Sequence, residues 1–248
     1  MTHSTIAALA LACTLFGCVG DAEDPADNDA ELATTSQDII GGTATYAAPE
    51  IGLLHVGNAL CTATMITPRL LLTAAHCVNY ANRYTDTHSG TFTIKRSSTA
   101  KYVYYTTRYE SYGSASEGYK DDLAIVRLAS AVPSTVASPY YAGHSYPAGG
   151  SGIAIYGYGD TNPFSQTGFG TKRVWKGSWN GTLAPYLSGI DFVIAEGDSG
   201  GPVVAPGHGI IGVSSRYYYN TSTSEYYDYF AYVVPAYPWI VALERSWG

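Results

Sequence analysis

Short apolar or alternating runs between turn residues are the feature that most constrains the fold of this chain. From residue 39 onward such runs recur as Ile51–Val56, Leu70–Thr73, Thr91–Lys95, Leu123–Leu128, Ile153–Tyr158, Gly209–Ser214 and Tyr229–Val234. Runs of this kind are typical of strands, and the 23 Tyr residues favour strand structure while the 27 Gly residues suit tight turns. Only Pro235–Ser246 suggests a helix, which we expect to begin at its proline. The pattern therefore predicts an all-β sandwich or barrel.

One glycine-rich segment, Glu196–Val203, carries a candidate nucleophile at Ser199. A Ser hydroxyl is a weak nucleophile near neutral pH and needs a base within about 3 Å, which in turn needs an orienting partner. Two further segments, Ala74–Cys77 and Asp121–Ile125, supply a His and an Asp. A plain glycine-rich hairpin is the alternative interpretation of the Ser199 segment. The presence of the other two segments makes that alternative weak.

Together with Ile39–Gly42, these segments resemble, in the same order, the motifs of the chymotrypsin/trypsin-like family of serine peptidases. The resemblance covers residues 39–248. It implies two antiparallel β-barrels, about 39–145 and 146–248, with the active site between them. The chain is therefore expected to be a serine endopeptidase acting on polypeptide substrates.

The resemblance assigns a role to each residue of the expected site. Ser199 attacks the scissile carbonyl, His76 transfers the proton, and Asp122 fixes the imidazole tautomer. Backbone N–H groups of Gly197 and Ser199 are expected to bind the oxyanion. Asp122 is preferred over Asp121 because an apolar strand follows it directly and successive strand residues face opposite ways.

Activation by cleavage is a second implication of the resemblance. In this family the amine freed at the Ile-Ile-Gly-Gly segment pairs with the Asp before the nucleophile. Here these residues are Ile39 and Asp198, so the uncut chain should be an inactive zymogen. Gln37 and Asp38 precede the cut where trypsin-like zymogens usually have Arg or Lys. An activating protease of another specificity is therefore expected.

The specificity pocket departs from that of the trypsins. Counting back from Ser199 places Val193 at the pocket base, where trypsins carry Asp. Ser215, Arg216 and Tyr217 are expected to line the substrate strand and the pocket edge, with bulky Tyr217 making the pocket shallow. Asp228 either lies on the rear wall, where it could receive a basic side chain, or is solvated in a Tyr-rich loop.

Four cysteines divide into two groups. Cys13 and Cys18 lie near the N-terminus, whereas Cys61 and Cys77 match the family's disulfide beside the catalytic His. A loop of that length contributes about 3 kcal/mol to stability. Two thiols without a second pair make a poor zinc site. No metal or other cofactor is therefore expected.

The N-terminal region is expected to be an export leader. The apolar stretch 6–17 is too short to span a membrane and resembles the core of a signal peptide, so residues 1–18 are expected to be a signal. The segment ending at Cys18 resembles a bacterial lipoprotein box, in which that Cys is acylated; the alternative is an ordinary signal peptide cut nearby. We expect a bacterial protein that is secreted, periplasmic or held at the cell surface. The only membrane attachment expected is this lipid anchor.

Charge is distributed unevenly along the chain. The formal net charge is −7, but seven of the 20 acidic residues lie within 19–38, which predicts an acidic linker or propeptide. The remaining 210-residue region (39–248) has 13 acidic and 13 basic residues. Nothing in this balance points to nucleic acid or an anionic membrane surface. A binding module that has lost catalysis and an esterase with little peptidase activity are the alternatives to an endopeptidase.

Overall fold

The computed structural model describes one unit of the chain, Ser36–Gly248. Within it the described residues are 39, 42–78, 90–113, 119–161, 167–179, 181, 193–220, 222 and 225–248. The expected signal at 1–18, the acidic segment 19–38 and Cys18 therefore lie outside the described residues.

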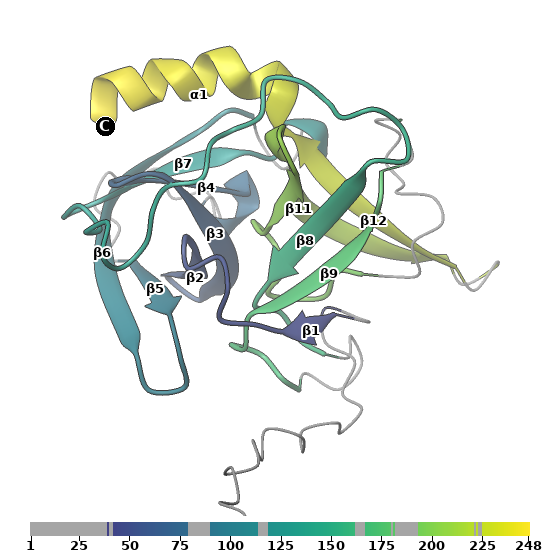
Figure 1. Cartoon of the computed structure of the whole chain (residues 1–248), viewed down its shortest axis with the longest axis horizontal. Helices are drawn as coiled ribbons and strands as arrows, with labels where there is room; N and C mark the ends of the chain where they lie inside the picture. The colour runs from purple at the N-terminus through teal and green to yellow at the C-terminus, as the bar shows by residue number, and fades with distance from the viewer. Residues whose placement is uncertain are drawn as a thin grey trace, which may run out of the picture. The chain divides into compact units, whose positions relative to one another are not determined.

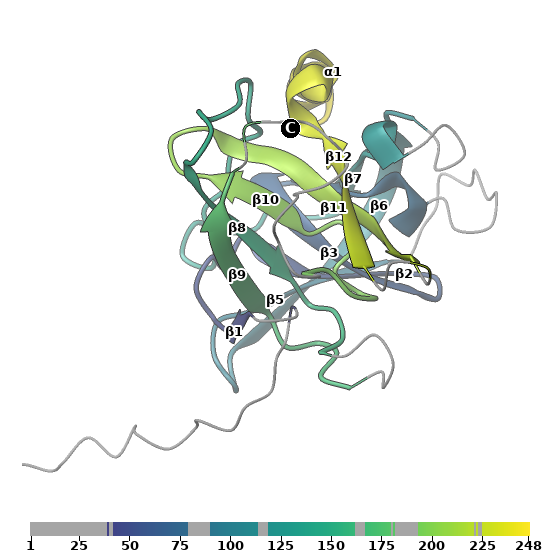
Figure 2. The ribbon, with the colours of Figure 1, turned by 90° about the vertical axis from the view of Figure 1, so that its right-hand side faces the viewer.

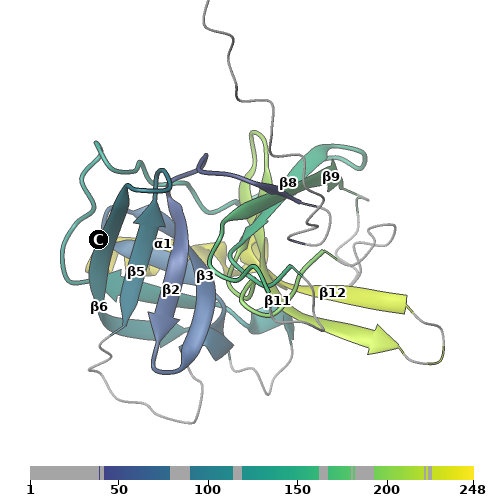
Figure 3. The same ribbon diagram turned by 90° about the horizontal axis from the view of Figure 1, so that it is seen from below.

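The first barrel is closed and made of six antiparallel strands in the order β2-β3-β4-β7-β6-β5 (Figures 1 and 3). Their bounds are β2 Ile51–Val56, β3 Ala59–Thr67, β4 Leu70–Thr73, β5 Thr91–Lys95, β6 Lys101–Ser111 and β7 Ala124–Leu128. The interior is filled by buried side chains such as Leu54, Met65, Leu71, Phe92 and Val126, which the strand register places on one face. Because inward and outward positions alternate along a strand, the apolar runs of the sequence supply this core.

The second barrel is a six-stranded antiparallel sheet in the order β1-β9-β8-β10-β11-β12, which Figure 2 shows face on. Its strands are β1 Thr43–Ala44, β8 Gly152–Gly157, β9 Arg173–Ser178, β10 Pro202–Ala205, β11 Gly209–Asn220 and β12 Glu225–Tyr232. Strand β1 pairs with β9 although it precedes the first barrel in sequence. The expected division at residue 145 therefore needs one correction, because the start of the domain belongs to the second sheet.

The C-terminal helix α1, Val233–Trp247, begins earlier than the predicted start at Pro235. The first N–H groups of a helix have no intrahelical partner, so Pro235 is tolerated inside the first turn. The helix buries Val233, Ala236, Ile240 and Leu243, which repeat every three or four residues, and it contacts β7 and β11.

The predicted all-β fold with two barrels and one C-terminal helix is confirmed. Strands β2, β4 and β5 have the bounds expected from the sequence, whereas β11 runs on to Asn220 instead of ending at Ser214. The described part of the chain contains no helix that is long and apolar enough to cross a membrane.

Candidate active site

Three separate elements bring the candidate catalytic residues together. His76 lies in the short 3-10 helix Ala75–Cys77, which follows β4 directly. Asp122 lies between the 3-10 helix Tyr119–Asp121 and β7, and Ser199 lies in the turn that precedes β10. Two of these elements belong to the first barrel and one to the second, so the site forms where the barrels meet.

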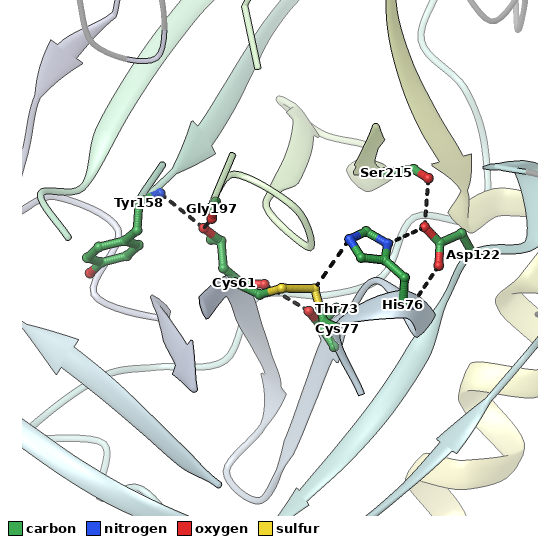
Figure 4. Close-up of a disulfide and its surroundings, with 9 residues drawn as sticks. Cys61, Thr73, His76, Cys77, Asp122, Tyr158, Gly197 and Ser215 are labelled. Atoms are coloured by element: carbon green, nitrogen blue, oxygen red, sulfur yellow. Dashed lines mark hydrogen bonds and ion pairs between the residues drawn. A yellow bond between two sulfur atoms is a disulfide. The ribbon is translucent and has the colours of Figure 1, made fainter. Parts of the chain in front are cut away.

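A chain of hydrogen bonds holds the His76 imidazole in place (Figure 4). Its Nδ1 lies 2.7 Å from Oδ2 of Asp122, and the His76 backbone N–H donates to Oδ1 of the same carboxylate at 2.8 Å. Ser215 Oγ also donates to Oδ2 of Asp122, at 2.6 Å. These contacts leave Nε2 of the imidazole as the nitrogen that faces away from the carboxylate.

Asp122 is only 2% exposed, and its hydrogen bonds keep it ionised. Burial raises the pKa of this carboxyl, but the hydrogen bonds and charge of His76, with the hydrogen bond from Ser215, bring the pKa below its usual value. The neighbouring Asp121 is exposed. The alternation argument for choosing between the two was wrong in its premise, because Asp121 ends a 3-10 helix and neither residue lies in a strand.

Ser199 and His76 line the same two cavities, of about 330 and 650 Å³. Among the described residues, no hydrogen bond joins the Ser199 hydroxyl to the imidazole, and Sγ of Cys77 lies 3.9 Å from Nε2 of His76. Contacts of this type are often long without substrate and tighten when it binds. Ser199 and His76 thus border the same open space, with no hydrogen bond formed between them.

The backbone before Ser199 requires glycine. Gly197 has φ of +95°, in the region that favours glycine. A Cβ there would lie 2.6 Å from the Phe169 ring and 2.9 Å from Cα of Gly159. The left-handed conformation and the close neighbours together explain why no larger residue fits at this position.

Thr62 links the two barrels at this turn, and sequence reasoning missed it. Its backbone N–H donates to the Ser199 carbonyl at 2.8 Å, and its Oγ1 donates to the Gly197 carbonyl at 3.0 Å. The same Oγ1 accepts from the Tyr158 N–H at 3.0 Å, and Thr73 Oγ1 donates to the Thr62 carbonyl at 2.8 Å. One buried residue of β3 therefore holds the carbonyls of both residues expected to form the oxyanion hole. Its position directly after Cys61 was the only available signal.

Asp198, next to the candidate nucleophile, is fully buried. Its carboxylate accepts from the N–H groups of Gly159 at 2.7 Å and Ala195 at 2.9 Å. Burial nevertheless raises the pKa of Asp198 to about 7. The Ile39 side chain is also buried, in a cluster that includes Val193 and Ile194. Two residues of the segment that leads to Asp198 thus share a hydrophobic core with the side chain expected to follow the activating cut.

The smaller cavity contains three of the five residues expected to contact substrate, namely Ser215, Arg216 and Tyr217. Val193 is fully buried and is not on the wall of this cavity. Neither interpretation of Asp228 matches the structure. It is 5% exposed and accepts from the N–H groups of Val193 at 2.8 Å and Ile194 at 3.4 Å, so it supports the backbone behind the wall.

Two aromatic rings contact the Arg216 side chain, which lines the smaller cavity. Tyr119, which sequence reasoning also missed, lines it and lies 5.5 Å from the Arg216 guanidinium, measured to the ring centroid. The Tyr229 ring lies 5.7 Å from the same guanidinium. These cation–π contacts hold the Arg216 side chain at the cavity edge.

The disulfide expected between Cys61 and Cys77 is present and ties β3 to the helix that carries His76 (Figure 4). The two sulfur atoms and a nitrogen of His76 lie within 4.8 Å of one another. Because both sulfurs are used in the disulfide, this group offers no thiolate donors to a metal. The disulfide therefore anchors the 3-10 helix that carries His76 to β3.

Comparison with known proteins identifies the class that this fold and site define. A protein-family model for trypsin matches residues 39–240. The chain belongs to the trypsin family and is a serine endopeptidase.

Curated relatives include two insect trypsins. Trypsin beta of Drosophila erecta is 28% identical over 239 residues, which cover 82% of this chain and 87% of that protein. Trypsin alpha of Drosophila melanogaster is 25% identical over 231 residues, covering 84% and 88%. These relatives are from insects, so the expected bacterial origin has no support from them.

Among solved structures, mouse neuropsin, described as a serine protease expressed in the limbic system of the brain, has the same fold. Its TM-score is 0.63 with 18% sequence identity, covering 82% of this chain and 98% of neuropsin. At this identity the likeness concerns the fold alone.

Proposed function

We propose that this endopeptidase hydrolyses peptide bonds through His76, Asp122 and Ser199, with an acyl-enzyme intermediate. The observation that carries the proposal is the fixed imidazole of His76. It is bound on one side by the buried Asp122 carboxylate, and it borders, with Ser199, two open cavities.

The chemistry follows from this arrangement. Ser199 Oγ forms a bond to the scissile carbonyl carbon while Nε2 of His76 takes its proton, and the carbonyl oxygen becomes an oxyanion near the N–H groups of Gly197 and Ser199. The imidazolium then protonates the leaving amine as the C–N bond breaks. Water attacks the resulting ester by the same steps, which frees the acid and restores the Ser199 hydroxyl.

Labelling with a fluorophosphonate tests the catalytic assignment. The processed chain, with Ile39 as its first residue, should be labelled stoichiometrically at Ser199 and should cleave denatured protein. Ser199→Ala should abolish labelling, and Asp122→Asn should slow hydrolysis by about 10⁴ because the wrong imidazole tautomer is favoured. An unlabelled processed chain would support the binding module, whereas turnover of acyl esters without protein cleavage would support the esterase.

Zymogen activation is part of the proposal. The buried carboxylate of Asp198 lacks a cationic partner in the hydrogen bonds and ion pairs of the described residues, and such a charge is costly. The ammonium group freed at Ile39 would supply that cation. Activity should then fall in alkali as the amine loses its proton. Full activity in a processed enzyme with an acetylated Ile39 would refute the coupling.

We further propose that residues 1–18 direct export, that 19–38 form an acidic propeptide, and that 39–248 form the peptidase domain. Secretion as a zymogen is consistent with the disulfide, since such bonds persist in oxidising compartments. The N-terminal sequence and mass of the exported protein test this directly. A mass that includes acyl chains on Cys18 would identify the lipoprotein form.

A further inference from the structure

The larger of the two cavities beside Ser199 has its own set of lining residues. It measures about 650 Å³ and is lined by residues 58–61 of the β2–β3 hairpin, by Phe169, and by Asp160, Glu196 and Gly197. Figure 4 labels three of its lining residues, Cys61, His76 and Gly197. It shares His76, Glu196 and Ser199 with the smaller cavity, which alone is lined by Ser215, Arg216 and Tyr217.

The side of the scissile bond that each cavity serves follows from the proposed function. Residues 212–216 of β11 are expected to pair with the acyl part of the substrate, and Ser215 and Arg216 line only the smaller cavity. Of the two cavities that Ser199 lines, the larger is therefore the one available to the rest of the polypeptide. That cavity receives the residues on the leaving-amine side of the bond.

Asp160 gives the larger cavity an unusual chemical character. The residue is 6% exposed, yet it borders the cavity. Among the described residues, no side-chain hydrogen bond or ion pair joins the Asp160 carboxylate to another group. Because Asp160 lines the cavity, a hydrogen-bond donor that enters the cavity could reach this carboxylate.

One acidic and one basic neighbour act on the Asp160 carboxylate. Burial and the Glu196 carboxylate raise its pKa, and the Arg173 guanidinium lowers it without reversing the shift. Nη1 of Arg173 is engaged with backbone carbonyls, those of Gly168 at 2.9 Å and Thr171 at 3.0 Å. A cation entering the cavity would meet two carboxylates, Asp160 enclosed and Glu196 exposed.

The walls of the cavity also suit a long side chain. Leu60 is 41% exposed on the hairpin, and the Phe169 ring lies against Gly197. Lys and Arg side chains cover apolar surface with their methylene groups while the charged end reaches a polar partner. Apolar walls with carboxylates alongside therefore match this class of side chain better than a short acidic or a purely aliphatic one.

We propose that this cavity is a subsite for a Lys or Arg side chain on the leaving-amine side of the scissile bond, with Asp160 and Glu196 as its specificity-determining residues. The inference rests on the proposed function, because it assumes that Ser199 marks the scissile bond. It names a substrate class, namely polypeptides with a basic residue just after the cut.

Matched internally quenched peptides test the subsite. Each pair has Lys or the uncharged norleucine at the first or the second position after the cut and is otherwise identical. For one of these positions, kcat/KM should be about tenfold higher with Lys. Asp160→Asn and Glu196→Gln should each lower this Lys-to-norleucine ratio at least threefold. Glu244→Gln, which removes the same charge from α1 outside both cavities, should leave the ratio unchanged.

The outcomes separate the subsite from the catalytic assignment. Equal hydrolysis of both peptides of each pair by an enzyme that is labelled at Ser199 would overturn the subsite and leave the proposed function intact. A Lys preference that survives both substitutions would also overturn it. A processed chain that neither cleaves the peptides nor reacts with a fluorophosphonate would refute the proposed function, and the subsite with it.

Discussion

Replacing Thr62 by Val removes the side-chain hydroxyl that links β3 to the turn before Ser199. The change deprives the Gly197 carbonyl of its donor and the Tyr158 N–H of its acceptor, both at 3.0 Å. No other hydrogen bond of the described residues reaches either group. Leaving a buried polar group unpaired costs about 1–3 kcal/mol, so two such groups cost about 2–6 kcal/mol. We expect the free energy of unfolding to fall by an amount near the middle of that range, about 4 kcal/mol.

The same substitution should also slow catalysis. The Gly197 carbonyl belongs to the turn that presents the proposed oxyanion donors, so the donors are displaced and not removed. Losing one such donor outright costs about 10²–10³ in rate. A displacement should therefore lower kcat about tenfold with little change in KM, as expected for an interaction made mainly in the transition state.

Urea unfolding and steady-state hydrolysis of one peptide measure both effects. Thr64→Val is the matched control, because Thr64 lies on the same strand, is buried, and has a hydroxyl without a hydrogen-bond partner. Thr64→Val should leave kcat unchanged and should leave the free energy of unfolding unchanged or raise it. Thr62→Ser keeps a hydroxyl and should therefore retain most of the stability and of the kcat that Thr62→Val loses. If Thr62→Val and Thr64→Val behaved alike in both assays, the linking role of Thr62 would be refuted.

Three further predictions concern the groups around the nucleophile. Ser215→Ala removes the 2.6 Å hydrogen bond to Asp122 and should lower kcat/KM about tenfold; an unchanged value would contradict the role of this bond. Burial raises the pKa of Asp198 to about 7 from 3.8, so the contribution of Asp198 to the free energy of unfolding of the uncut chain should be fully present below about pH 4 and be lost as pH rises through 7. Urea unfolding of Asp198→Asn across that range should show a flatter dependence, and an unaltered slope would exclude Asp198 as its source. Replacing Cys61 and Cys77 together by Ala should cost about 3 kcal/mol of stability in the same assay, and a loss below about 1 kcal/mol would count against the bond as a main stabiliser.

Some strands were predictable and others were not, for a physical reason. Apolar runs bounded by turn residues gave β2, β4 and β5 their bounds, because most positions of these strands are buried and the runs stop where the turns begin. Strand β3 was not predicted, since its buried positions include Thr62 and Thr64 among Ala and Met. These threonines look polar in sequence but lie between the two barrels.

The end of β11 shows how pairing extends a strand beyond its apolar pattern. The sequence suggested an end at Ser214, where the apolar residues stop. In the structure the strand continues to Asn220 because Tyr217 and Tyr218 pair with Asp228 and Tyr227 of β12. Cross-strand partners of this kind are distant in sequence, and their contribution does not show in a local pattern.

The sequence by itself determined the local features: the strand-forming runs, the pair of cysteines, and the short motifs around His76, Asp122 and Ser199. These depend on neighbouring residues and on backbone preferences, which a linear pattern records. Only the tertiary structure decided that Thr62 holds the turn at Gly197, that Asp228 supports the backbone behind the cavity, and that Asp160 faces the larger cavity. Each of these arrangements involves segments that are far apart along the chain. The packing of the two barrels brings those segments together.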